Sequence, residues 1–282
     1  MKKRFYYITT IMLSAAALSL SSCLKDDSRF TNFAGAGTTI ELPIEAYHGE
    51  GNLIAEAVPI QTPGPVVPLI VNVASPKPLT SALNVTLALD AAALTAYNTA
   101  NGTSYLLLPA ADYNVANWTV TVPANQREAT LNITINSALI DLSQQYVLPI
   151  SIASASGQQV NQFHTVLFSI LVKNKWDGTY LASGVRHHPT AGDFSFSYDV
   201  AMGTSGANSI EGPALADLQA DLILTINPDN TVVVTSGPSG QPTTENEPGT
   251  SNVYDPTTKT FTLHYQYNTS APRKIDETLV LQ

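Results

Sequence analysis

Apolar residues occupy every second position over much of the chain, and this period of two restricts the fold more than any other feature of the sequence. Residues 67–73 alternate in this way, and residues 85–89 do so again after a break that contains two prolines. The same pattern returns at 146–152, 166–172, 194–200, 222–226 and 261–267. Residues two apart lie on one face of a strand, so each segment has an apolar face to bury. We therefore predict an all-β protein.

Turn and cap residues predict two local features. Alternating segments at 118–122 and 131–135 flank a polar connection, which is typical of a β-hairpin. Residues 91–100 are mostly alanine, with Asp90 as the N-cap and Asn101-Gly102 as the end of a helix. A helix of this length is marginal on its own, so we expect it to lie across one end of the strands.

The chain is long enough for two domains with separate cores, and a polar break at 173–175 marks the boundary between them. We predict an antiparallel β-sandwich with one short helix over residues 38–173. Residues 174–282 then form a small antiparallel β-barrel with a turn at 227–230, where proline, asparagine and aspartate suit the backbone of a turn. Pairing rules leave the strand order of both domains open.

The first domain resembles an uncharacterised N-terminal domain family of Bacteroidota surface lipoproteins. The resemblance is carried by LNVTLALDAAALTAYNTANGTSYLLLPAADYNV at 83–115, WTVTVPANQREATLNITI at 118–135 and YVLPISIASASG at 146–157. It implies a fold and a setting: relatives occur in lipoproteins of glycan-utilisation systems, some of them fused to glycoside hydrolase domains. We identify no hydrolase domain in this sequence.

The second domain is similar to the small lipocalin-like β-barrel domains of the same lipoproteins. This resemblance is carried by WDGTY at 176–180 and KTFTLHYQYNTSAPRKIDETLVLQ at 259–282. In lipocalins a tryptophan near the start of the sequence stacks against an arginine near its end. The resemblance therefore implies that Trp176 lies within cation–π reach of Arg273 and closes the base of the barrel.

The N-terminus has the features of a lipoprotein export signal. Three basic residues at 2–4 precede an uncharged, mostly apolar run at 5–20, which is shorter than the roughly 20 residues of a membrane-spanning helix. Leu20-Ser21-Ser22-Cys23 fits the lipobox read by the lipoprotein signal peptidase, which needs small residues before the cut and a cysteine immediately after the cut to carry the lipid. We predict a signal peptide at 1–22 and a lipidated Cys23 that holds the protein on a membrane. The alternatives are a plain secretory peptide or a short membrane anchor.

The residues after Cys23 bear on location. Lys25, Asp26 and Asp27 resemble the export signal of Bacteroidota surface lipoproteins, within a tether at 23–37. We expect a lipid-anchored protein of the outer membrane that is exposed at the cell surface. The alternatives are a charged, solvated tether and an anchor on the periplasmic face.

Charge and cysteine content exclude several classes of protein. The 282 residues have a net charge of −9, and removal of residues 1–22 leaves 10 basic and 22 acidic residues, a net charge of −12. Such a chain has no electrostatic footprint for nucleic acid, so we expect no nucleic-acid partner. Cys23 is the only cysteine, which excludes an internal disulfide and a cysteine-based zinc site.

The motifs for catalysis and metal binding are weak. Arg186-His187-His188-Pro189 with Asp193 contains two imidazoles and a carboxylate, but adjacent side chains of an extended strand point in opposite directions. We therefore expect a solvated loop and no metal. The acidic pairs Asp276-Glu277, Glu245/Glu247 and Asp217/Asp221 are neighbours in sequence only, and no nucleophile elbow or phosphate loop occurs. We predict that the protein is not an enzyme and needs no cofactor.

Aromatic residues offer a binding alternative, because sugars stack their apolar faces on tryptophan and tyrosine. The candidates are Tyr198, Tyr254, Tyr265, Tyr267 and Trp118. They share strand faces with other apolar residues, so the competing interpretation is that they belong to the core.

The function expected from these features is a non-catalytic surface lipoprotein of a glycan-acquisition system that binds carbohydrate or a partner protein. The first alternative is a structural or assembly subunit that uses exposed strand edges for protein contacts. The second is a carrier of a small hydrophobic molecule, which needs an apolar cavity of at least about 300 Å³ in the barrel.

Overall fold

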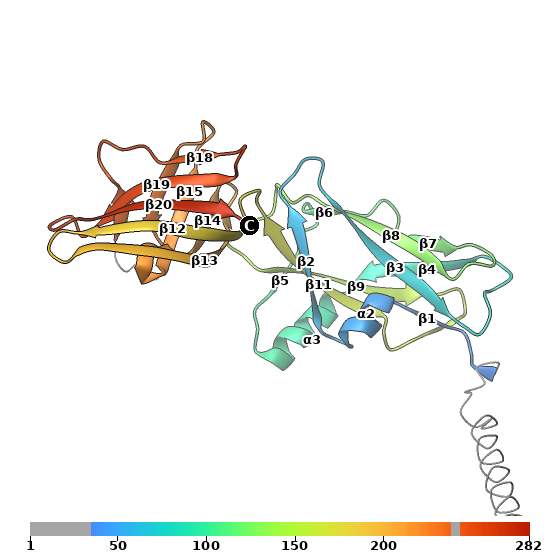
Figure 1. The fold of residues 1–282 in the computed structure, drawn as a ribbon. Helices are drawn as coiled ribbons and strands as arrows, with labels where there is room; N and C mark the ends of the chain where they lie inside the picture. Colours follow the sequence, from blue (N-terminus) through green and yellow to red (C-terminus); the bar gives the residue numbers. More distant parts are fainter. Residues whose placement is uncertain (1–34, 238–242) are drawn as a thin grey trace, which may run out of the picture.

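The computed structural model describes residues 35–237 and 243–282. The predicted signal peptide, Cys23 and the residues Lys25, Asp26 and Asp27 lie outside the described residues. The described chain is almost entirely β-structure, as predicted, with a sandwich followed by a nearly closed barrel (Figure 1). Within the described part, no helix is long and apolar enough to cross a membrane.

The N-terminal domain is a sandwich of two sheets that enclose one core. One sheet has the order β10-β1-β3-β8-β6, and the other has the order β2-β11-β9-β4-β7 with β5 attached to β9. Most pairs are antiparallel, but β1–β10, β2–β11 and β5–β9 run parallel. The strands are β1 (Thr39–Glu41), β2 (Leu53–Pro59), β3 (Val66–Ala74), β4 (Leu83–Leu89), β5 (Leu106–Leu107), β6 (Tyr113–Asn114), β7 (Thr119–Val122), β8 (Glu128–Ile135), β9 (Tyr146–Ser154), β10 (Gln159–Val160) and β11 (Thr165–Lys173).

The period of two predicted the buried face of these strands. In β3 the four alternating residues 67, 69, 71 and 73 are all buried. In β4, Val85 and Leu87 are buried as expected, but Leu89 is 37% exposed because the strand ends there and the chain leaves the sheet.

The predicted hairpin at 118–135 is wrong. β7 pairs with β4 in one sheet, and β8 pairs with β3 in the other. Both strands direct their apolar faces to the same core, but from opposite sides of the sandwich. The connection between β7 and β8 therefore crosses from one sheet to the other. The alternation of apolar residues predicts which face of a strand is buried, but it does not predict which strand is the partner, and this is why a hairpin was expected.

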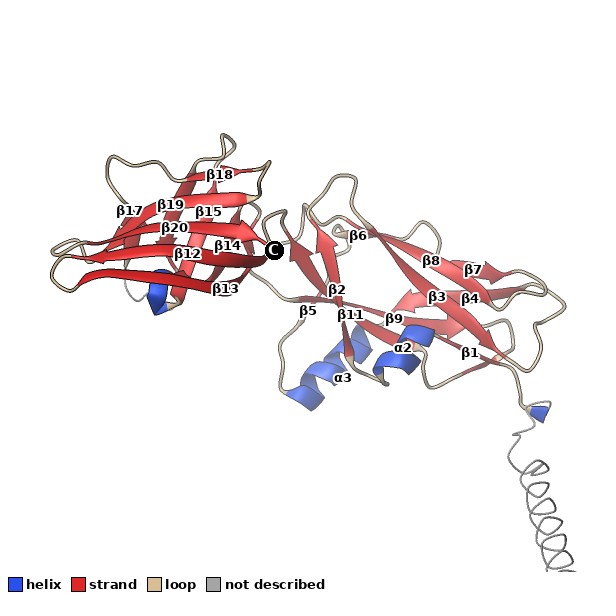
Figure 2. Cartoon of the chain, in the orientation of Figure 1, coloured by secondary structure: helices blue, strands red, loops and turns tan. Residues whose placement is uncertain are grey.

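Two helices cover the sandwich. The predicted helix is α3 (Ala91–Asn101): the Asp90 carboxylate accepts a hydrogen bond from the Ala93 N–H (3.0 Å), and Gly102 ends the helix at φ 65°. It lies over the outer face of the β9–β11 sheet rather than across its end, because Leu94 packs there with buried residues of both strands. A second helix, α2 (Pro43–His48), was not predicted and also contacts β11 (Figure 2).

The C-terminal domain is a nine-stranded antiparallel sheet that curls into a nearly closed barrel. The order is β16-β15-β14-β13-β12-β20-β19-β17, with β18 attached to β19. The predicted turn at 227–230 connects β15 to β16. The elements are β12 (Gly178–His188), β13 (Gly192–Gly206), β14 (Ser209–Leu215), η3 (Ala216–Leu218), β15 (Ala220–Ile226), β16 (Val232–Ser236), β17 (Thr244–Asn246), β18 (Val253–Asp255), β19 (Thr260–Tyr267) and β20 (Arg273–Leu281).

The expected stacking of Arg273 on Trp176 is wrong. Trp176 lies just before β12, whereas Arg273 lies beside His188 at the far end of that strand, with 3.2 Å between the Arg273 Nη2 and His188 Nε2 atoms. The 11 residues of β12 separate the two by about 35 Å. The cation over the Trp176 ring is instead the Nζ of Lys175, 4.5 Å from the ring centroid.

Candidate functional site: a cleft between the domains

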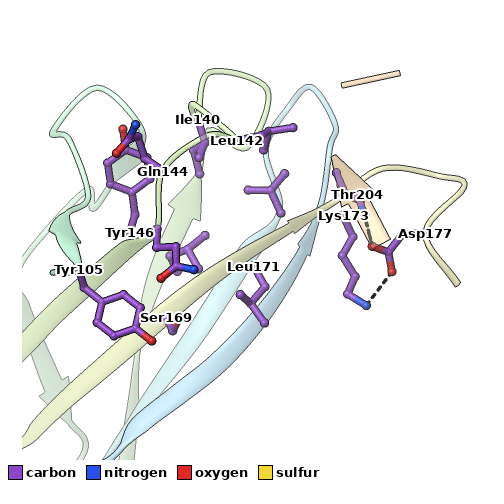
Figure 3. A pocket seen from close by; sticks show the side chains of 13 residues that line it. Tyr105, Ile140, Leu142, Gln144, Tyr146, Ser169, Leu171, Lys173, Asp177 and Thr204 are labelled. Carbon is purple, nitrogen blue, oxygen red and sulfur yellow. Dashed lines mark hydrogen bonds and ion pairs between the residues drawn. The ribbon is translucent and has the colours of Figure 1, made fainter. Parts of the chain in front are cut away.

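A cleft of about 410 Å³ lies where the sandwich meets the barrel (Figure 3). The sandwich contributes Tyr105, the loop between β8 and β9, the start of β9 and the end of β11. The barrel side contributes Asp177, just before β12, and Thr204 on β13. The cleft therefore depends on how the two domains are joined.

Hydrogen bonds of the linker fix this junction. The Asp177 carboxylate accepts hydrogen bonds from the Lys173 Nζ at 2.9 Å and from the Thr204 N–H at 2.8 Å, so one side chain ties the end of β11 to β13. The buried side-chain amide of Asn174 donates to the carbonyls of Gly206 and Ser209, at 2.9 and 2.7 Å. These contacts hold the linker against the β13–β14 hairpin.

The charge at the junction is also fixed. Partial burial raises the pKa of Asp177, but hydrogen bonds from Lys173 and Thr204 outweigh this effect and hold the pKa below its usual value. Asp177 is therefore a carboxylate at neutral pH, and the exposed Lys173 beside it keeps the floor of the cleft close to neutral overall.

The cleft combines apolar and amide groups. Tyr146 and Ile140 are almost fully buried in its wall, and Leu171 is 45% exposed. Gln144 and Gln145 are exposed at its rim, and Ser169 also lines it. Aromatic and aliphatic faces next to side-chain amides and hydroxyls are the groups that bind the apolar faces and hydroxyls of sugars.

The aromatic residues proposed from the sequence lie elsewhere. Tyr265 is fully buried, and Tyr254 and Tyr267 are 6% and 9% exposed, all in the core of the barrel. Tyr198 is half-buried and donates its hydroxyl to the Ala216 carbonyl at 2.8 Å. Trp118 packs against the core of the sandwich. Their burial agrees with the competing interpretation that these residues stabilise the fold.

The two histidines at the end of β12 have separate partners. His187 contacts Asp193 (2.8 Å) and Asp276 (3.2 Å), whereas the Nδ1 of His188 accepts hydrogen bonds from the turn that follows it. In the part of the chain that the structure describes, no group of three or more histidine, cysteine or acidic side chains is arranged to hold a metal ion.

The acidic pairs are also divided between different partners. Asp217 pairs with Arg186, Glu247 with Lys274, and Asp276 with His264. Glu277 points the other way from Asp276 and is buried in the barrel.

Reasoning from the sequence missed the residues of the cleft. Tyr105, Gln144 and Ser169 lie in segments separated by up to 64 positions, and no motif connects them. The one available signal was the polar break at 173–175, which marked a boundary but not a site.

Comparisons with known proteins agree with this architecture. A family model described as an N-terminal domain matches residues 44–159, and a second, described as C-terminal, matches residues 164–281. A solved protein of unknown function from Bacteroides ovatus has a TM-score of 0.65 at 14% identity, covering 87% of this chain and 95% of that chain. The chain shares its two-domain fold with Bacteroides proteins.

Two further solved structures have the same fold. A multidomain protein from Bacteroides ovatus has a TM-score of 0.54 at 17% identity, covering 86% of this chain and 94% of its own. An auxiliary nutrient binding protein from Bacteroides thetaiotaomicron has a TM-score of 0.50 at 15% identity, and the match covers 81% of this chain and 90% of that protein's chain. No curated protein matches the chain. At such identities the likeness is one of fold.

Proposed function

We propose that this protein is a non-catalytic, lipid-anchored surface protein of a glycan-acquisition system, and that it binds carbohydrate in the cleft between its domains. The observation that carries the proposal is the cleft itself, where Tyr105 and Tyr146 lie with Gln144, Gln145 and Ser169 in a space of about 410 Å³. This volume and this mixture of groups suit one or a few sugar units.

Two further observations support the proposal. The auxiliary nutrient binding protein from Bacteroides thetaiotaomicron has the same two-domain fold. The acidic residues Asp217, Asp276 and Glu247 each pair with a different basic or histidine side chain, whereas most glycoside hydrolases use two carboxyl groups that face one another across the glycosidic bond.

The anchor in this proposal is a lipid on Cys23, with Lys25, Asp26 and Asp27 directing export to the cell surface. The first described residues leave the sandwich at the end opposite to the barrel (Figure 1). An anchor at Cys23 would therefore hold the sandwich nearer the outer membrane and present the cleft and the barrel farther from it.

A protein partner in an assembly is the second candidate. Three exposed leucines lie in or beside the cleft: Leu171 lines it, Leu106 follows the lining residue Tyr105, and Leu139 precedes the lining residue Ile140. Their exposed fractions are 45% for Leu171, 45% for Leu106 and 65% for Leu139. Exposed leucines of this kind are common where proteins dock. A hydrophobe carrier receives less support, because fully buried Tyr180, Phe261 and Tyr265 occupy the interior of the barrel.

The test is a binding assay on the secreted form without residues 1–23, against a panel of soluble polysaccharides by affinity electrophoresis and calorimetry. We expect at least one polysaccharide to bind. Tyr105→Ala and Gln144→Ala should each weaken binding at least fivefold, because each removes a stacking or hydrogen-bonding group from the cleft.

The matched control is Tyr47→Ala, since Tyr47 is 86% exposed and lies outside the cleft. It should bind like the unchanged protein. If no polysaccharide binds, the assembly function replaces this one. If the cleft variants bind normally, the carbohydrate site lies elsewhere.

A further inference from the structure

A second pocket, of about 350 Å³, lies on the sandwich beside the two helices. Its wall includes Glu45 of α2, Glu50 in the turn after α2, Tyr97 of α3 and His164 just before β11. Both helices contact β11, and Figure 1 shows them along the same side of the domain. The cleft between the domains lies at the other end of β11 and shares no lining residue with this pocket.

Glu45 is the unusual group in this pocket. Its side chain is 1% exposed, and the Oε1 atom accepts a hydrogen bond from the Gly51 N–H. The Oε2 atom is buried and has no hydrogen-bond partner among the described residues. Burial raises the pKa of Glu45 above its usual value. A buried carboxylate oxygen without a donor is costly, and a ligand that donates to it would remove that cost.

Two further ionisable side chains, His164 and Glu50, line this pocket together with the uncharged Asn101, Gln162 and Thr165. The Nδ1 atom of His164 lies 2.8 and 2.9 Å from the carbonyl oxygens of Asn161 and Gln162. Carbonyl oxygens only accept, so Nδ1 carries a proton and donates to them. Glu50 adds an exposed carboxylate to the same wall.

The pocket therefore suits a ligand group that donates several hydrogen bonds and carries positive charge. The half-buried ring of Tyr97 adds an aromatic face, which attracts cations. A metal ion fits less well, because the described side chains form no cluster of three or more metal-ligating groups. A primary ammonium group has three donors and needs no fixed coordination geometry.

We propose that this pocket binds the primary ammonium group of a small ligand, with the Glu45 carboxylate as hydrogen-bond acceptor, Glu50 as a second negative charge and Tyr97 as the aromatic wall. Ala93, Ala96 and Ala100 line the pocket beside Tyr97, and their small side chains leave room for the body of the ligand. The proposal is independent of carbohydrate binding in the cleft between the domains.

Calorimetry on the secreted form at pH 7 tests this directly. The probes are glucosamine and cadaverine, which carry a primary ammonium, with N-acetylglucosamine and glucose as neutral comparators. We expect both amines to bind and both neutral sugars to bind at least tenfold more weakly. Equal binding of glucosamine and N-acetylglucosamine, or no binding of either amine, would overturn the proposal.

The decisive variant is Glu45→Gln. Its side-chain oxygen can still accept from the Gly51 N–H, so the α2–β2 turn should be retained while the charge is lost. Amine binding should fall at least tenfold. The matched control is Glu128→Gln, an exposed residue of β8 outside this pocket, which should bind amines normally.

Two further variants keep the test valid if Glu45→Gln unfolds. Glu50→Gln and Tyr97→Leu change groups of the wall that are not fully buried, and each should weaken amine binding at least threefold. Gln144→Ala, in the cleft between the domains, should leave amine binding unchanged, so that the two proposals can fail separately. Normal amine binding by Glu45→Gln, or by both wall variants, would refute the site.

Discussion

A buried carboxyl group in the barrel leads to a specific prediction about stability and pH. Glu277 is 2% exposed, and its Oε2 atom accepts a hydrogen bond from the hydroxyl of the fully buried Tyr265 at 2.7 Å. The Oε1 atom has no partner among the described residues. Burial raises the pKa of Glu277 from 4.5 to about 8, although the hydrogen bond from Tyr265 acts in the opposite direction.

The direction of the effect follows from proton binding. Below pH 4.5 the carboxyl is protonated in both the folded and the unfolded chain. Between pH 4.5 and about 8 the unfolded chain loses the proton and the folded barrel keeps it, so the free energy of unfolding falls as pH rises. Between pH 5 and pH 8 the loss attributable to this group is about 3 kcal/mol.

Glu277→Gln removes the titration and keeps an acceptor for the Tyr265 hydroxyl. The assay is urea unfolding at pH 5, 6, 7 and 8, followed by tryptophan fluorescence in a Trp118→Phe background, so that the buried Trp176 reports on the barrel. Between pH 5 and pH 8 we expect the free energy of unfolding of the barrel with Glu277 to fall by about 3 kcal/mol relative to that of the Glu277→Gln variant. Asp199→Asn, an exposed change on β13, is the control. Parallel curves for Glu277→Gln and the parent would refute the reasoning.

Three further predictions test other parts of the account. Cys23→Ala should abolish the incorporation of radiolabelled fatty acid into the protein, and unchanged labelling would contradict lipid attachment at Cys23. Asp217→Ala should destabilise the barrel by about 3 kcal/mol in urea unfolding, because Arg186 is 7% exposed and would remain buried without its carboxylate; a loss below about 1 kcal/mol would contradict this. Asp90→Ala should cost about 1 kcal/mol in the unfolding of the sandwich, and no change would show that the cap is dispensable.

The sequence predicted those parts of the fold that depend on neighbours along the chain. Alternation gave the buried face of β3, and the local cap residues Asp90 and Gly102 gave both ends of α3. The turn at 227–230 was predicted for the same reason, because its backbone depends on its own side chains.

Features that depend on distant segments were not accessible in this way. The apolar faces of β7 and β8 fit a hairpin and a sheet-crossing connection equally well, and only packing decides between them. The Trp176–Arg273 pair came from a resemblance, and the antiparallel register of β12 and β20 places the two residues at opposite ends.

The candidate site was the least predictable part. The tyrosines chosen from the sequence, such as Tyr265, are in the core because strand faces rich in aromatic residues are usually buried. The cleft forms only where the linker hydrogen bonds of Asp177 and Asn174 bring Tyr105 and Gln144 beside the barrel, and these contacts have no local signature.

Hydrogen–deuterium exchange with and without a bound polysaccharide tests the central claim most directly. Binding in the cleft should slow amide exchange in three separate segments, residues 105–107, 139–146 and 169–177, because each contributes to or adjoins the lining of the cleft. Exchange in β16 and β18, on the barrel, should stay the same. Protection confined to the barrel, or to the segments around α2 and α3, would contradict a carbohydrate site between the domains.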